Sequence, residues 1–306
     1  MPSPADSLTE RFACRREVPL ARWTPLKIGG PAELFFEPAK PEQLLELLEL
    51  LHAQGLPFRI LGGGANLLAP DGGVRGAVIH TGQMRRLFRD GDACLRAWPG
   101  VTLPQLVRTA GGLGLSGVED LIGVPGHLGG ALAMNAGGGD WGIWDQVREV
   151  TLWRAGEGAA DFRPEQVGPR YRDGNLRGAV VLEALLAFEP GLPAAVKARA
   201  EEILRRKNLS QPVTLSSAGC AFKNPPGDSA GRLIDAAGLK GAREGGVLVS
   251  ERHANFLVNL GGARAADVVA LLERIEATVR QRFGVELERE LVVWPEPGAA
   301  GPDAGA

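Results

Sequence analysis

Two glycine-rich stretches in the first half of the chain restrict the folds that it can adopt. The first, Gly62-Gly-Gly-Ala-Asn66, directly follows residues 57–61, an apolar segment predicted to be a buried strand. Consecutive glycines carry no Cβ and can align backbone N–H groups in a geometry that accepts a pyrophosphate. A tight β-turn explains this loop equally well when it is considered alone. The loop lacks the third glycine of a GxGxxG fingerprint, and Pro70-Asp-Gly-Gly73 follows it instead of a helix, so we expect no Rossmann site.

The second stretch, residues 117–137, interleaves small and apolar side chains. Its glycines would let a large flat group lie against the main chain, although close helix packing is the alternative. Together with the first loop it indicates one extended ligand with a pyrophosphate and a ring system. Without Rossmann geometry, FAD is favoured over NAD. The candidate FAD contacts are Gly62, Gly63, Gly64, Ala65, Asn66, Gly126, Gly130, Asn135 and Gly137.

The remaining pattern predicts an α+β chain without a regular βαβ alternation. In the first half, helices are expected over 41–55 and 103–110, with strands near 77–79, 94–98, 147–153 and 180–188. A charged helix over 193–207 leads to a second unit with helices over 230–237 and 265–283 and strands near 247–249, 255–259 and 287–294. We predict an N-terminal arm (1–21), a larger domain (22–192), a smaller domain (193–297) and a disordered tail (298–306).

Composition excludes several classes of function. The net charge of −2 gives no global attraction to nucleic acid, and no apolar run is long enough to span a membrane. The first residues do not resemble a signal peptide. Cys14, Cys94 and Cys220 are too far apart for a CxxC site and are odd in number, so we expect a reducing, cytoplasmic location and no metal. The apolar helix stripes are accounted for by a core, and a monomer is favoured.

Three segments could carry chemistry. Cys220 lies between small residues, just before Lys223 and Asn224, which could bind an anion. Lys223 would lower the pKa of the neighbouring thiol and help it to donate a proton, whereas a buried inert cysteine is the ordinary alternative. Arg172 lies before a strand and, alone, would be a solvated arginine. In the predicted strand 287–294, alternation would place Glu288 and Glu290 on one face, which alone suggests a solvent-exposed face.

The order of these motifs resembles the UDP-N-acetylenolpyruvoylglucosamine reductase (UDP-N-acetylmuramate dehydrogenase) family. The resemblance covers nearly the whole chain, from Thr24 to Trp294. It is carried by residues 24–32, 61–66, 123–130 with 134–137, 171–172, 217–225, 237–241, 249–256 and 287–290. Several of these motifs are weak individually, but eight in the family's order are specific.

The resemblance implies an FAD-binding domain of the vanillyl-alcohol-oxidase (PCMH) type and a smaller α+β substrate-binding domain. It implies that NADPH reduces a tightly, non-covalently bound FAD. The reduced FAD then converts UDP-N-acetylglucosamine enolpyruvate to UDP-N-acetylmuramate for peptidoglycan. By position, Arg172 and Glu290 would stabilise the enolate, Cys220 would donate the proton, and Lys223 and Asn224 would bind substrate. The alternatives are a sugar or alcohol oxidase on the same scaffold, and a flavin-binding protein without catalysis.

The chain departs from the family pattern at three points. Many members carry serine where this chain has Cys220, and His127 stands where a small hydroxyl residue is common. After Arg172 this chain has Asp173-Gly174-Asn175 in place of the serine that is usual nearby. Tyr171 is the only tyrosine, so the chain resembles the subgroup that lacks a tyrosine-bearing substrate loop. Because an ionised carboxylate would repel a developing enolate, Glu290 is expected to be protonated or bridged through Arg172.

Overall fold

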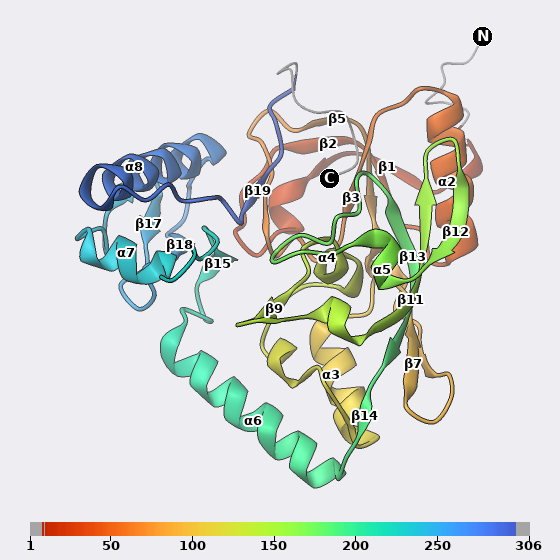
Figure 1. Cartoon of the computed structure of the whole chain (residues 1–306). Helices are drawn as coiled ribbons and strands as arrows, with labels where there is room; N and C mark the ends of the chain where they lie inside the picture. The colour runs from red at the N-terminus through yellow and green to blue at the C-terminus, as the bar shows by residue number, and fades with distance from the viewer. Residues whose placement is uncertain (1–7, 9, 298–306) are drawn as a thin grey trace.

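The computed structural model describes Leu8 and residues 10–297, so the predicted disordered tail (298–306) lies outside the described residues. Within the described residues, three sheets of four or five strands carry the architecture, and helices cover them. Figure 1 shows the second unit, with α7 (Ala230–Ala236) and α8 (Ala265–Phe283), on one side of the larger first unit. No helix among the described residues is long and apolar enough to cross a membrane.

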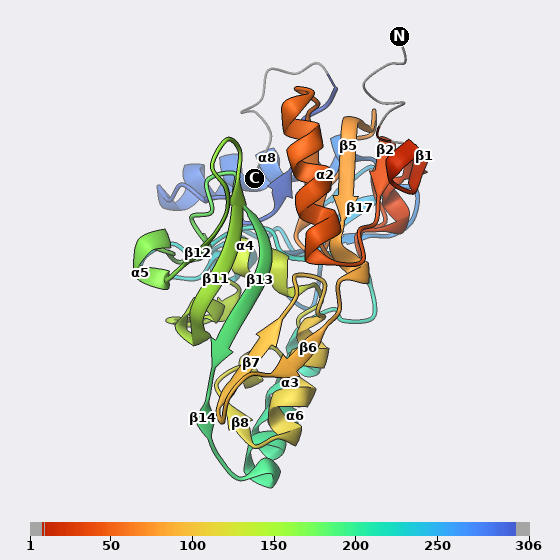
Figure 2. The ribbon, with the colours of Figure 1, turned by 90° about the vertical axis from the view of Figure 1, so that its right-hand side faces the viewer.

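The first sheet has the strand order β1-β2-β5-β3. Its strands are β1 (Cys14–Pro19), β2 (Pro31–Phe36), β3 (Phe58–Leu61) and β5 (Val74–His80). β2, β5 and β3 run parallel. The helix α2 (Pro41–Ala53) packs its leucine stripe onto this sheet, with Leu44, Leu48 and Leu51 fully buried. Figure 2 shows α2 alongside β5 and β2.

The predicted arm over residues 1–21 is partly wrong, because Cys14–Pro19 form β1, which pairs antiparallel with β2. This edge strand is followed by the short 3₁₀ helix η1 (Leu20–Arg22). Only Val18 of β1 is buried. Because backbone hydrogen bonds to β2 hold the strand, it needs no alternation of apolar residues, and its sequence therefore shows no strand pattern.

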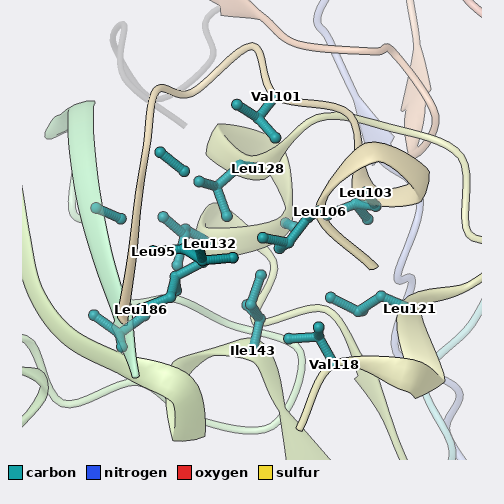
Figure 3. Packing of buried hydrophobic residues seen from close by; sticks show 14 of the residues in the cluster. Leu95, Val101, Leu103, Leu106, Val118, Leu121, Leu128, Leu132, Ile143 and Leu186 are labelled. Atoms are coloured by element: carbon teal, nitrogen blue, oxygen red, sulfur yellow. The ribbon is translucent and has the colours of Figure 1, made fainter. Parts of the chain in front are cut away.

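The second sheet is antiparallel throughout, in the order β12-β11-β13-β7-β6. Its strands are β6 (Leu87–Arg89), β7 (Cys94–Ala97), β11 (Val147–Arg154), β12 (Gly158–Phe162) and β13 (Val180–Ala187). Two helices, α3 (Leu103–Gly112) and α4 (Leu128–Ala133), supply the other side of the core. In Figure 3, Leu128 and Leu132 of α4 lie between the sheet residues Leu95 and Leu186 and the α3 residues.

Shorter elements complete the first unit. They are β4 (Leu67–Leu68), β8 (Leu115–Ser116), β9 (Gly137–Gly138), β10 (Trp141–Gly142), β14 (Glu189–Pro190), α5 (Pro164–Val167), η2 (Thr81–Gln83), η3 (Glu119–Leu121) and η4 (Ile143–Gln146).

The helix α6 (Pro193–Ser210) belongs with the first unit, although the sequence assigned it to the second domain. Ile203 is part of the core that α3 and α4 share, and Leu204 packs against it. Lys207 donates from Nζ to the backbone carbonyls of Asp120 and Ile122 (3.1 Å for Ile122). The predicted helix is confirmed, but its packing moves the start of the second unit to about residue 211.

The second unit is an antiparallel sheet, β15-β18-β17-β16, under α7 and α8. Its strands are β15 (Ser216–Cys220), β16 (Arg243–Glu244), β17 (Val247–Val249) and β18 (Phe256–Asn259). The predicted stripe on α8 is confirmed as core: Val268, Leu271, Leu272, Ile275 and Val279 are all fully buried.

The predicted strand over 287–294 is wrong except at β19 (Val292–Val293). β19 does not join the sheet of the second unit. It pairs in parallel with β4, which directly follows the first glycine loop. Trp294 is buried with Leu61 and Leu67 of the first unit. Figure 1 shows β19 returning from the second unit to the first unit. The chain therefore closes the junction between its two units with its own last strand.

Asp71, which follows β4, strengthens the same junction. Its carboxylate accepts hydrogen bonds from the first backbone amides of α8, Ala265 N (2.8 Å) and Ala266 N (3.2 Å). We expect Asp71→Ala to lower the free energy of unfolding by about 1 kcal/mol, because it removes a helix N-terminal cap. Urea denaturation measures this loss. Asp71→Asn keeps an acceptor oxygen and should lose less; equal losses in the two variants would contradict the capping role.

Candidate active site

The two predicted glycine loops touch each other within the first unit. A Cβ on Gly63 would lie 2.7 Å from Gly126 Cα, and a Cβ on Gly64 would lie 2.5 Å from the carbonyl oxygen of Trp23. Gly64 and Gly126 have positive φ angles of 61° and 122°, which glycine adopts without strain. A Cβ on Gly130, in contrast, would meet no atom within 4 Å. The loops thus form a surface of main chain without side chains, here called the glycine wall, which borders open space at Gly130.

His127 lies beside this wall, at the N-cap of α4. Its Nδ1 is buried without a hydrogen-bond partner among the described residues. Burial lowers the pKa of His127 to about 4, with smaller contributions from His80 and Arg85. The ring is therefore neutral at neutral pH. An unpaired polar atom next to a glycine wall fits a polar ligand such as the diphosphate of FAD.

Asn135 and Gly137, two predicted FAD contacts, use their polar groups on the chain itself. Asn135 donates from Nδ2 to the carbonyl of Arg170 (2.8 Å), and its Oδ1 accepts from Trp144 N (3.3 Å). The carbonyl of Gly137 accepts a hydrogen bond from Arg172 Nη2 (2.8 Å). Both residues therefore support the Arg172 turn, and their contact with FAD stays a prediction.

Arg172 is held in a tight turn. Arg170 and Asp173 exchange two backbone hydrogen bonds of 2.7 and 3.1 Å across it, and Arg172 has a φ of 55°. Its Nε lies 3.1 Å from Oε1 of Glu290, and both side chains are at most 19% exposed. The guanidinium is thus committed to one partly buried carboxylate rather than solvated, as an isolated loop arginine would be.

Glu290 reaches this position because its segment is irregular. Its N–H donates to the carbonyl of Ala221 (2.8 Å), and its own carbonyl accepts from Asn66 Nδ2 (2.7 Å). The predicted common face with Glu288 is wrong: the Glu288 side chain is 73% exposed and pairs with Lys223. Burial raises the pKa of Glu290, while Arg172 and Lys223 oppose that rise. The carboxyl group therefore takes up a proton more readily than a solvated glutamate.

Cys220 ends β15 and lies within electrostatic reach of both Glu290 and Arg172. Burial, followed by the charge of Glu290, raises the pKa of the thiol to about 12, and Arg172 opposes the rise. The predicted lowering of this pKa by Lys223 is wrong, because Lys223 Nζ is bound to Glu288 at 2.6 Å. Cys220 therefore keeps its proton at neutral pH.

Asn224 and Lys223, the predicted substrate contacts, lie on the loop after Cys220. Asn224 is exposed, and its Oδ1 accepts a hydrogen bond from Ala230 N (3.1 Å) at the start of α7. The Lys223 side chain is 17% exposed. Their substrate-binding role stays a prediction. Sequence reasoning assigned no role to Asn255, whose side chain bonds both backbone groups of Phe222; its only signal was its place in the motif over 249–256.

Alkylation of Cys220 by iodoacetamide should follow this electrostatic arrangement. Because the thiolate is the nucleophile, we expect labelling to rise about tenfold per pH unit from about pH 7 to pH 10 without reaching a plateau. Glu290→Gln removes a negative charge and should speed labelling at each pH. Mass spectrometry after timed labelling distinguishes Cys220 from Cys14 and Cys94. Glu288→Gln, a change at the exposed neighbour, is the control and should have no effect; a plateau below pH 9 would contradict the assignment.

Comparisons with known proteins identify first the class and then the family. The glycine loops belong to a flavoprotein: the family model "FAD binding domain" matches residues 32–159. A second model, "UDP-N-acetylenolpyruvoylglucosamine reductase, C-terminal domain", matches residues 211–294. This match agrees with a second unit that starts after α6.

Relatives named UDP-N-acetylenolpyruvoylglucosamine reductase match nearly the whole chain. The chain is 44% identical over 285 residues to UDP-N-acetylenolpyruvoylglucosamine reductase 2 of Symbiobacterium thermophilum, covering 92% of each chain. It is 44% identical over 282 residues to the reductase of Geotalea uraniireducens, covering 92% of this chain and 94% of the relative. A crystal structure of the reductase from Thermus caldophilus matches with a TM-score of 0.80 and 39% identity, over 92% of this chain and all of that one.

The chain therefore belongs to the UDP-N-acetylenolpyruvoylglucosamine reductase family and is an FAD-dependent oxidoreductase. The family resemblance and the predicted α+β fold class, with an FAD-binding domain and a smaller C-terminal domain, are confirmed.

Proposed function

We propose that this protein reduces UDP-N-acetylglucosamine enolpyruvate to UDP-N-acetylmuramate with electrons from NADPH, in the cytoplasmic synthesis of peptidoglycan precursors. The observation that carries the proposal is the Arg172–Glu290 ion pair, which lies within electrostatic reach of the Cys220 thiol. A cation, a carboxyl group with a raised pKa and a protonated acid are the groups that this reduction requires.

The three side chains divide the work. When bound, FAD would supply the hydride that goes to the terminal vinyl carbon, and NADPH would supply the electrons that replenish it. Negative charge then develops on the substrate carboxylate, where Arg172 stabilises it. Glu290 is bridged to Arg172 and, because burial raises its pKa, it takes up a proton more readily than a solvated glutamate; once protonated, it would donate a hydrogen bond instead of repelling this charge. Cys220 transfers its proton to the adjacent carbon, so that one hydride and one proton saturate the double bond.

The glycine loops are suited to hold the cofactor. Gly63 and Ala65 approach Gly126, Gly62 approaches His127 and Gly130, and Gly130 borders open space. The unpaired Nδ1 of His127 at the same wall offers a further polar group. These residues would bind the diphosphate through backbone amides and the neutral imidazole. Lys223 and Asn224 would contact the substrate's nucleotide side.

The decisive experiment is a visible spectrum of the purified protein, followed by anaerobic addition of NADPH and then of the enolpyruvyl sugar nucleotide. We expect a flavin spectrum that bleaches with NADPH and returns with the sugar nucleotide. Bleaching without return would overturn the substrate, and rapid oxygen consumption with a sugar alcohol would favour an oxidase. A colourless protein that takes up no FAD would overturn the reading of the glycine loops.

Gly130→Ala tests the cofactor site directly. Because a Cβ at Gly130 meets no protein atom within 4 Å, the variant should fold normally. The added methyl group would occupy part of the open space that we assign to FAD. We expect its FAD dissociation constant to rise about tenfold, which corresponds to about 1.4 kcal/mol. Fluorescence titration of the apoprotein with FAD measures this. Gly112→Ala is the matched control, because Gly112 is also a helical glycine with open space around it; equal affinities would place FAD elsewhere.

A further inference from the structure

The amide side chains of three asparagines hold the three candidate catalytic segments. Asn135 bonds the carbonyl of Arg170 in the Arg172 turn. Asn255 bonds both backbone groups of Phe222, two residues after Cys220. Asn66 bonds the carbonyl of Glu290. The sequence predicted Asn66 and Asn135 as FAD contacts, so this arrangement gives their side chains a different use.

Asn66 makes the longest of these connections along the chain. Its Nδ2 donates to the carbonyl of Glu290 at 2.7 Å, across 224 positions. The backbone carbonyl of Asn66 accepts a hydrogen bond from Val292 N at 3.1 Å, directly before the β4–β19 ladder begins. Asn66 thus contacts the chain on both sides of Leu291. The backbone that carries the Glu290 carboxyl is therefore bound to the end of the first glycine loop.

The Glu290 backbone is also bound to the segment that carries Cys220. The carbonyl of Ala221 accepts from Glu290 N at 2.8 Å and from Leu291 N at 3.2 Å. The N–H of Ala221 in turn donates to the carbonyl of Asn255 at 2.8 Å. Loss of the Asn66 amide would remove the direct hydrogen bond from the first unit to the Glu290 backbone. The backbone bond at Val292 would remain, but the Glu290 carboxyl could shift relative to the turn that carries Arg172.

We propose that Asn66 is a positioning residue that binds the Glu290 segment to the glycine loop and thereby sets the position of the Glu290 carboxyl against Arg172 and Cys220. The effect on turnover rests on the proposed function. The placement of Glu290 against Cys220 does not, because both residues belong to the chain itself. Misplacement of a reacting group by about 1 Å can cost about 10²-fold in rate.

The experiment compares Asn66→Ala and Asn66→Leu with Asn259→Ala. Asn66→Leu keeps about the size of the side chain but has neither the amide donor nor a charge, so it also serves if Asn66→Ala folds poorly. Asn259 is a matched control, because its Nδ2 likewise donates to a backbone carbonyl of the other unit, that of Leu26, at 2.9 Å. Three quantities are measured: the FAD dissociation constant, the rates of flavin reduction and re-oxidation, and the pH profile of Cys220 alkylation in the apoprotein.

Both Asn66 variants should bind FAD as tightly as Asn259→Ala and be reduced by NADPH at a rate within about twofold of it. Re-oxidation by the enolpyruvyl sugar nucleotide should be about 10- to 100-fold slower. Cys220 should be alkylated faster than in Asn259→Ala at each pH, because Glu290 no longer holds its charge beside the thiol. A purely structural role of Asn66 would leave this alkylation profile unchanged.

Two results would overturn the positioning role. If the Asn66 variants match Asn259→Ala in re-oxidation and in alkylation, the hydrogen bond sets nothing in the site. If they lose FAD affinity while the alkylation profile stays that of the control, Asn66 is a cofactor ligand instead. Failure of the proposed function has a different signature: the reduced wild-type protein would not be re-oxidised by the sugar nucleotide. The alkylation profile would still decide the role of Asn66 in that case.

Discussion

Cys220→Ala is expected to slow re-oxidation of the reduced flavin by the enolpyruvyl sugar nucleotide by about 10²- to 10⁴-fold, the usual contribution of a positioned general acid. Reduction of the flavin by NADPH should proceed at the wild-type rate, because that step needs no proton from Cys220. Anaerobic stopped-flow absorbance measures the two half-reactions separately. The selective loss of one of them would identify the thiol as the proton donor.

Two variants control this result. Cys220→Ser keeps a proton-bearing group at the same atom position and should recover most of the rate. Cys94→Ala removes a buried cysteine of β7, far along the chain from the site segments, and should leave both half-reactions unchanged. Because the pKa of Cys220 is raised to about 12, its protonated form persists through the neutral range, and the rate should show no loss attributable to this thiol between about pH 6 and pH 9. Wild-type re-oxidation in Cys220→Ala would contradict the proton-donor role.

Arg172→Met is expected to slow the same half-reaction by about 10²- to 10³-fold, because one preorganised charge that stabilises the developing enolate is removed. Arg172 also lowers the pKa of Glu290, so its loss should raise that pKa further. Deprotonation of Glu290 would then begin at a higher pH. The measurement is the rate of re-oxidation as a function of pH, with flavin reduction by NADPH as the internal reference.

Arg172→Lys separates charge from geometry. Arginine bonds Glu290 through Nε and Gly137 through Nη2, two directions that a single ammonium on a flexible stem does not reproduce. We expect Arg172→Lys to recover only part of the re-oxidation rate that Arg172→Met loses. Arg177→Met is the matched control, since Arg177 is nearby in sequence and has a similar positive φ of 51°. A loss in Arg177→Met equal to that in Arg172→Met would point to a general disturbance of the loop.

Local patterns in the sequence predicted the elements whose stability is local. The leucine stripe of α2 and the apolar stripe of α8 repeat with the helical period, and both are buried as expected. The sequence assigned the two glycine loops to one ligand site but did not predict their direct contact, which the structure places at Gly63 and Gly126. Eight motifs in order carried the family identity, and the comparisons confirmed it.

The remaining features depend on contacts between distant residues, which periodicity does not register. The segment around Glu290 takes its hydrogen bonds from Ala221 and Asn66 rather than from a regular strand partner, so alternation gave Glu288 and Glu290 the same face in error. Lys223 was the nearest cation to Cys220 in sequence, but it pairs with Glu288. The direction of the Cys220 pKa shift follows instead from burial and from Glu290, which is 70 positions away in the chain.

The pairing of β19 with β4 also governs the order in which the site can form during synthesis on the ribosome. Both glycine loops and the Arg172 turn emerge early, and they can collapse with the first unit while translation continues. Val292 and Val293 are among the last described residues to be made, and only they complete the ladder beside Asn66. Pairings between positions so far apart are slow to form, because the loop-closure entropy is lost before the contact is gained. Release of the nascent chain before residue 290 would therefore yield a protein that has both glycine loops but no Arg172–Glu290 pair.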